Sequence, residues 1–80
     1  METEAVAELI REGMPGAEVR VTGDGSHFEA VVVSEAFAAK SPIQKQRLVM
    51  ATVRPQIDSG ELHALSIKTF TPEQWAEQRG

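Results

Sequence analysis

Two strand patterns joined by one short turn most constrain the fold of this chain. Residues 17–22 alternate between apolar and polar side chains, the period of a strand with one buried face. Residues 27–34 form a second strand pattern, and the run of three valines in it indicates a strand buried on both faces, hence central in a sheet. Between them, the sequence GDG at residues 23–25 supplies turn chemistry, because glycine tolerates positive φ. An antiparallel hairpin is therefore predicted.

Helical patterns lie on both sides of this hairpin. Apolar residues spaced by three and four predict a short helix from about Thr3, ended by the glycines and proline within residues 13–16. Ser41 and Pro42 open a second helix, as a capping hydroxyl followed by proline at the first helical position. Pro55 has no N–H to donate, so this helix should kink or end near it. The expected buried arc, with Val49 at its edge, consists of Ile43, Met50, Val53 and Ile57.

A third strand and a last helix are predicted near the C-terminus. Residues 62–70 alternate, with every second residue from His63 to Thr69 on one face. The sequence TPEQ at residues 71–74 is a capping box that begins a short helix carrying Trp75. A helix separates the second and third strands, so they should pair in parallel through a right-handed crossover. The predicted order is α-β-β-α-β-α, an α+β fold whose three-stranded mixed sheet has helices on one face.

The composition limits the class of protein. Eighty residues predict a single domain, residues 1–80, with a small core. The absence of cysteine removes disulfides and thiolate ligands and fits a reducing compartment, so we expect a cytoplasmic protein. The acidic N-terminus and the lack of an apolar run of about 20 residues predict neither a signal peptide nor a membrane span. No G-x-S-x-G motif, Walker loop or nucleophile–base pair occurs at a recognisable spacing, so we expect no enzyme.

The two histidines of the chain are expected at one end of the sheet. His27 opens the second strand and His63 the third, and adjacent parallel strands lie about 4.8 Å apart. Imidazole binds zinc, iron, copper and nickel, but two imidazoles complete neither a structural zinc site nor a cluster held by one chain. A site shared with a second protein that brings sulfur ligands removes this objection. From the residues alone, His63 fits a hydrogen-bonded core residue, and His27 fits an exposed strand-edge residue.

Two segments give the chain a resemblance to a known family. GSHFEAVVVSEAF at residues 25–37 and HALSIKTFTPEQW at residues 63–75 resemble the BolA family, in particular its YrbA/IbaG-like branch, and the likeness extends from about Pro15 to Trp75. The resemblance implies a type II KH-like fold. It also implies a heterodimer with a monothiol glutaredoxin, bridged by a [2Fe-2S] cluster. The glutaredoxin and a glutathione supply thiolates, and the BolA protein supplies histidine.

The same resemblance implies a role and a set of ligands. The expected role is that of an adaptor in iron–sulfur cluster trafficking, iron regulation or stress response, with the isolated chain a monomer or weak homodimer. The family's near-invariant ligand matches His63 in the segment LHALS. The second ligand comes from the loop and strand edge of the hairpin, where His27 is the leading candidate and Asp24 the alternative. Many relatives have a basic-His-basic triplet where this chain has KQR at residues 45–47, so no histidine role carries over there.

Nucleic-acid binding is the rival hypothesis. KH-like folds bind nucleic acid, and some BolA relatives are described as transcriptional regulators. The expected contact residues, for nucleic acid or for the partner protein, are Lys45, Arg47 and Arg54, and Lys40 is a further cation near the same helix. Arg47 and Arg54 are seven residues apart and share one stripe of the helix, whereas Lys45 points elsewhere. Against this hypothesis, the G-x-x-G loop that clamps the backbone in KH domains is absent. The net charge of −4 also opposes binding to phosphates.

Overall fold

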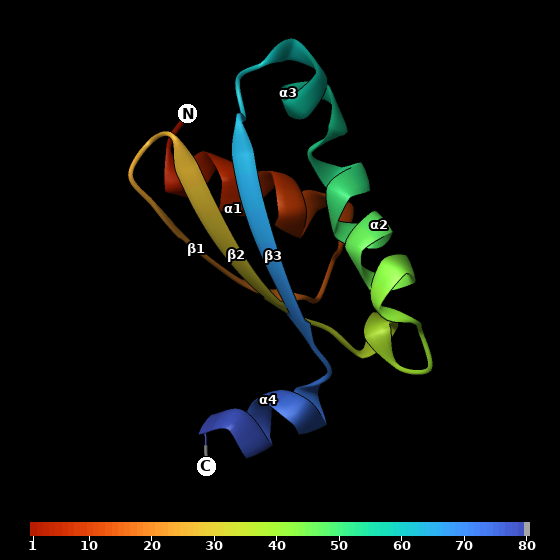
Figure 1. Cartoon of the computed structure of the whole chain (residues 1–80). Coiled ribbons are helices and arrows are strands. Elements are labelled where there is room, and N and C mark those ends of the chain that lie inside the picture. The colour runs from red at the N-terminus through yellow and green to blue at the C-terminus, as the bar shows by residue number, and fades with distance from the viewer. Residues whose placement is uncertain (80) are drawn as a thin grey trace.

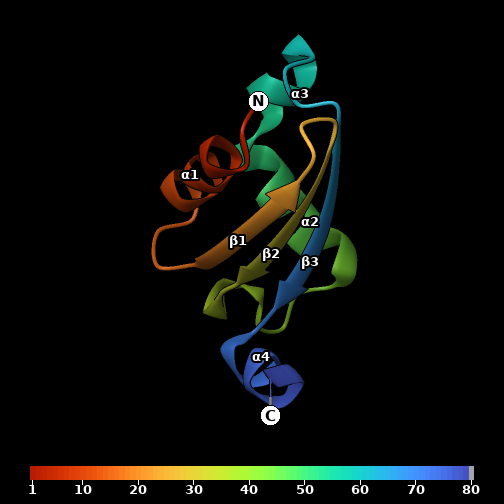
Figure 2. The same cartoon turned by 90° about the vertical axis from the view of Figure 1, so that its left-hand side faces the viewer.

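The computed structural model describes residues 1–79 and contains one three-stranded sheet with helices packed against it (Figure 1). Its last helix lies beyond the end of the third strand, away from the other helices (Figures 1 and 2). Within residues 1–79, none of the helices combines the length and apolar character that crossing a bilayer requires. In chain order the elements are α1 (Thr3–Gly13), β1 (Glu18–Gly23), β2 (His27–Val33), the 3₁₀ helix η1 (Glu35–Phe37), α2 (Pro42–Thr52), α3 (Arg54–Ser59), β3 (Ala64–Phe70) and α4 (Pro72–Arg79).

The sheet has the predicted mixed topology, with β2 in the centre. β1 pairs with β2 in antiparallel orientation, and β2 pairs with β3 in parallel orientation. The parallel register runs from His27 opposite Ala64 to Val33 opposite Phe70. The alternate residues Phe28, Ala30 and Val32 of β2 are buried and face the helices. The residues that pair with them in β1 and β3 lie on the same face of the sheet.

The core lies between this face of the sheet and the helices α1 and α2. α1 contributes Val6 and Ile10, and α2 contributes Val49, all at 0% exposure. Phe37 in η1 is also fully buried. The sequence patterns did not predict η1, which begins where the Ser34 hydroxyl accepts a hydrogen bond from the Ala36 N–H at 3.1 Å. This turn carries the largest fully buried side chain into the core.

The break near Pro55 is confirmed, but the predicted arc of the central helix is wrong at its start. α2 ends at Thr52, and Pro55 lies in the first turn of a separate helix, α3. Ile43 is 63% exposed, whereas Val49 is fully buried. Val53 and Ile57, at and beyond the break, still lie in or against the core, so the prediction fails in the first turn of α2 and not at the break. Only the second half of α2 reaches the core.

The ends of the other elements follow local signals. Ser41 and Gln44 form a reciprocal capping box at the start of α2, as do Thr71 and Gln74 at the start of α4. β3 begins at Ala64, two residues later than predicted. The reason is that Leu62 is buried, and its N–H donates to the carbonyl of residue 56 rather than to a neighbouring strand.

Candidate metal-ligand site at the histidine end of the sheet

The parallel register brings the two histidines to the same end of the sheet. His27 is the first residue of β2 and lies opposite Ala64, and His63 immediately precedes Ala64. Neighbouring strands are about 4.8 Å apart, so the two backbones run side by side here. Strand alternation fixes the face of His27 but not that of His63, because β3 has not yet begun at His63. The topology thus gathers the only two imidazoles of the chain at one edge.

Both histidines are exposed. The strand pattern predicted that His63 shares a face with Leu65 and Ile67, and those two residues do pack against the core. His63 itself is exposed and is not a core residue. Exposed imidazoles at a sheet end are accessible to a second polypeptide. Their role as ligands remains a prediction.

Asp24 fixes the backbone that carries His27. Its Oδ1 accepts hydrogen bonds from the backbone N–H groups of Ser26 and His27, both at 2.9 Å. The Asp24 N–H in turn donates to the His27 carbonyl at 3.2 Å. This Asx turn gives Asp24 a positioning role that the sequence analysis did not assign, although Asp before Gly-Ser in a hairpin loop is its usual signal.

The glycines of this loop serve two different purposes. A Cβ on Gly23 would lie 2.5 Å from the His27 carbonyl oxygen and 2.8 Å from Cδ1 of Phe28, so only a hydrogen fits there. Gly25 has φ of +96°, a conformation that side-chain-bearing residues rarely adopt. The loop before His27 is therefore tightly specified.

The Asp24 carboxyl gives this loop a pH dependence. Hydrogen bonds from the backbone N–H groups of His27 and then Ser26 lower the pKa of Asp24 from its ordinary value of 3.8. A lowered folded-state pKa means that the loop's stabilisation is present above the ordinary pKa and is lost only as pH falls through the lowered value. We expect the amide NMR signals of Ser26 and His27 to titrate with a midpoint below pH 3.8, because the pKa of Asp24 is lowered. Asp24→Asn should abolish their titration, and a midpoint at or above the ordinary value would contradict this account.

The candidate cations do not form one surface. Arg47 and Arg54 line one shallow hollow on α2, and Lys40 shares a second hollow with Arg47. Lys45 is half-buried and lines a different hollow with residues of β3 and α4. Arg54 already pairs with Asp58, with Nε 3.8 Å from Oδ1. The structure therefore brings three of the four cations together and separates Lys45.

The number of ligands limits what this site can hold. Among residues 1–79, no group of three or more His, Cys, Asp or Glu side chains is arranged to hold a metal ion. Asp24, His27 and His63 therefore do not converge as a closed site. Two exposed imidazoles fit a metal group only as part of its ligand set, with the remaining ligands from another molecule.

Comparison with known proteins gives the family. The model of the family described as BolA-like protein matches residues 6–74. The chain belongs to the BolA family. It is 37% identical to the acid stress protein IbaG of Escherichia coli, over 99% of this chain and 94% of that protein. The BolA homologue of Coxiella burnetii has the same fold, with a TM-score of 0.86 and 34% identity over 95% of this chain and 97% of that one.

Structural similarity within the BolA family extends to eukaryotes. Yeast Fra2 is similar to this chain with a TM-score of 0.76 and 32% identity, over 96% of this chain and 86% of that protein. The predicted BolA-like α+β fold is thereby confirmed, and the histidine end described above belongs to a BolA domain.

Proposed function

We propose that this BolA-family protein is a non-enzymatic adaptor that binds a monothiol glutaredoxin. In this proposal His63, with His27 as the second group, contributes imidazole to a [2Fe-2S] cluster held mainly by the glutaredoxin and a glutathione. The role is cluster trafficking or iron regulation. The observation that carries the proposal is that both histidines of a cysteine-free BolA chain are exposed at one end of its sheet.

The chemistry of the donors supports this division of ligands. A cluster of this type prefers thiolate, and this chain has none, so a partner must supply the sulfur. Oδ1 of Asp24 already accepts two backbone hydrogen bonds, which favours His27 over Asp24 as the second ligand. A ligating imidazole must be free of a proton at the bonding nitrogen, so acid should weaken this chain's share of the site.

Anaerobic co-expression with a monothiol glutaredoxin tests the proposal. Visible absorption and circular dichroism of the purified complex are compared for the wild type, His63→Ala and His27→Ala. Gln46→Ala, an exposed change on α2, is the control. We expect altered cluster spectra for the His63 variant, a smaller change for the His27 variant and none for the control. Identical spectra in all four proteins would refute the ligand role.

A second candidate function is nucleic-acid binding by α2. The observation that favours it is the segment of residues 36–57, which contains four cations and no Asp or Glu in a chain of net charge −4. Half of the eight Lys and Arg residues thus lie in a segment without acidic side chains, although the whole chain is acidic. Phosphates would contact the hollows that Arg47 shares with Lys40 and Arg54.

Salt dependence distinguishes this second candidate. If nucleic acid binds here, Arg47→Ala should flatten the slope of log K against log salt by about 0.7, the value for one lost phosphate contact on a single strand. Arg54→Ala should act in the same direction, and His63→Ala should leave the slope unchanged. Fluorescence anisotropy with a labelled single-stranded oligonucleotide measures these slopes. Equal slopes for the wild type and both arginine variants would exclude α2 as the contact surface.

A further inference from the structure

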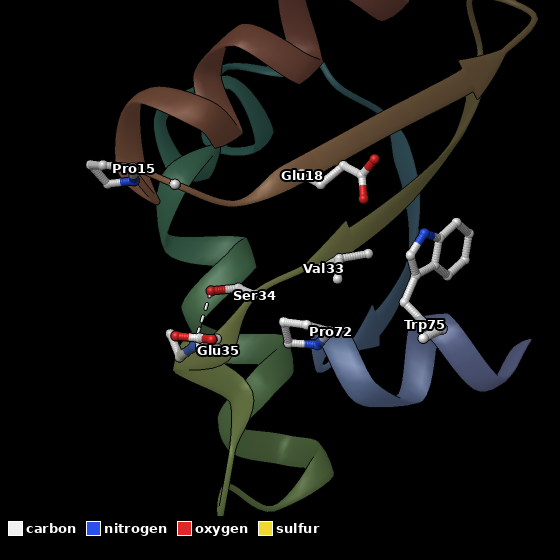
Figure 3. A pocket seen from close by; sticks show the side chains of 10 residues that line it. Pro15, Glu18, Val33, Ser34, Glu35, Pro72 and Trp75 are labelled. Atoms are coloured by element: carbon white, nitrogen blue, oxygen red, sulfur yellow. Dashed lines mark hydrogen bonds between the residues drawn. The ribbon is translucent and has the colours of Figure 1, made fainter. Parts of the chain in front are cut away.

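A groove lies at the end of the sheet opposite the histidines. It has a volume of about 580 Å³ and lies where β2 ends, between the turn after α1 and the helix α4. Figure 3 shows Val33 in its middle, with Trp75 on one side and Glu35 on the other. Because β2 runs from His27 to Val33, the full length of the strand separates this groove from the candidate ligand site.

The groove offers an apolar floor beside an unsatisfied donor. Val33, Pro72 and Trp75 line it, and the Trp75 ring packs against Phe70 with centroids 5.2 Å apart. Nε1 of Trp75 is buried and has no hydrogen-bond partner. A buried N–H without a partner is destabilising, so an acceptor that reaches Nε1 when the indole reorients on binding would be favoured.

The polar groups of the groove are acidic. Glu18 and Glu35 line it, and among the side chains of residues 1–78 no Lys or Arg does. Glu18 forms an ion pair with Arg20, whose Nη2 lies 3.7 Å from Oε1 of Glu18. The guanidinium of Arg20 also lies 5.9 Å from the centroid of the Trp75 ring. Glu35 has no ion pair with a side chain of residues 1–78. The groove therefore has one available carboxylate and repels anions such as phosphates.

We propose that this groove binds an extended peptide segment of a partner protein with a basic side chain beside an apolar one. The Lys or Arg of that segment pairs with Glu35, and its apolar neighbour covers Val33 and Pro72. A backbone carbonyl of the segment accepts a hydrogen bond from Nε1 of Trp75. The donor, the apolar floor and the carboxylate together match a polypeptide, whereas a free amine would use only the carboxylate. This surface is independent of the proposed glutaredoxin function.

The only tryptophan of the chain reports on this groove directly. The probe is a blocked pentapeptide, Ala-Lys-Leu-Val-Ala, and its matched control carries Glu in place of Lys. Titration at low salt should give a saturable change in tryptophan fluorescence with the Lys peptide and at least about fivefold weaker binding with the Glu peptide. No cluster or glutaredoxin is needed, so this test can fail without touching the proposed function.

Two variants, compared by calorimetry, complete the test. Glu35→Gln should weaken binding of the Lys peptide about fivefold. Glu61→Gln removes an exposed carboxylate near the opposite end of the sheet and should leave binding unchanged. The proposal is overturned if neither peptide binds, if both bind equally, or if Glu35→Gln binds like the wild type. It is equally overturned if agmatine, a free guanidinium amine, binds as tightly as the Lys peptide.

Discussion

Replacing His63 with alanine is expected to weaken retention of the bridging cluster at least about tenfold. Loss of a residue that merely supports a metal ligand typically costs 10- to 100-fold in metal affinity, so loss of a direct ligand should cost no less. The measurement is chelator competition on the purified complex with glutaredoxin, followed by the decay of visible absorption. His27→Ala should have a smaller effect, and Gln46→Ala, an exposed change on α2, should have none.

The exposure of His63 makes this experiment interpretable. His63 lies before β3 begins and is not part of the core, so its truncation should change the free energy of unfolding by less than about 0.5 kcal/mol. Urea unfolding of the isolated variant checks this. A variant that is as stable as the wild type and yet retains the cluster equally well would contradict the ligand role.

Replacing Phe37 with alanine is expected to lower the free energy of unfolding by about 3–5 kcal/mol. Phe37 is 0% exposed and comes from the short helix η1, between β2 and α2. Its removal leaves a cavity in the core between sheet and helices. At about 0.05–0.15 kcal/mol per residue, an 80-residue chain has a total stability of only about 4–12 kcal/mol. At the lower end of this range the variant would be largely unfolded at room temperature, and at the upper end it would stay folded with a clearly lower unfolding midpoint.

Ile43 provides the matched control for Phe37. It is also apolar but 63% exposed, so Ile43→Ala should change the free energy of unfolding by less than about 0.5 kcal/mol. Both variants are compared by urea denaturation followed by far-ultraviolet circular dichroism. Similar unfolding midpoints for the two variants would mean that the core is not where the structure places it.

Local signals predicted most of this fold, because each acts over a few residues. The caps at Ser41 and Thr71, the break at Pro55 and the hairpin at residues 23–25 all lie where the sequence indicated them. The error at Ile43 arose because helical spacing shows which residues share one side of a helix but not how far along the helix the core extends, and the first turn of α2 lies beyond the core. η1 has only three residues, too few for any periodicity to mark it.

Predicting where the candidate site lies required the strand topology as well as local sequence patterns. Parallel pairing of β2 and β3 was inferred from the intervening helix, and that pairing alone brings His27 and His63 to one end of the sheet. The positioning role of Asp24 depends on the loop conformation, which strand alternation does not describe. The ligand roles involve a second polypeptide, whose surface this sequence does not encode.

Pulsed electron paramagnetic resonance of the reduced cluster complex tests the central claim most directly. The complex is prepared with ¹⁵N-histidine in this chain only, against an unlabelled glutaredoxin. We predict a ¹⁵N hyperfine coupling to the cluster that the unlabelled complex lacks, and His63→Ala should remove the part of this coupling that comes from His63. Indistinguishable spectra from the labelled and unlabelled complexes would show that no imidazole of this protein reaches the iron.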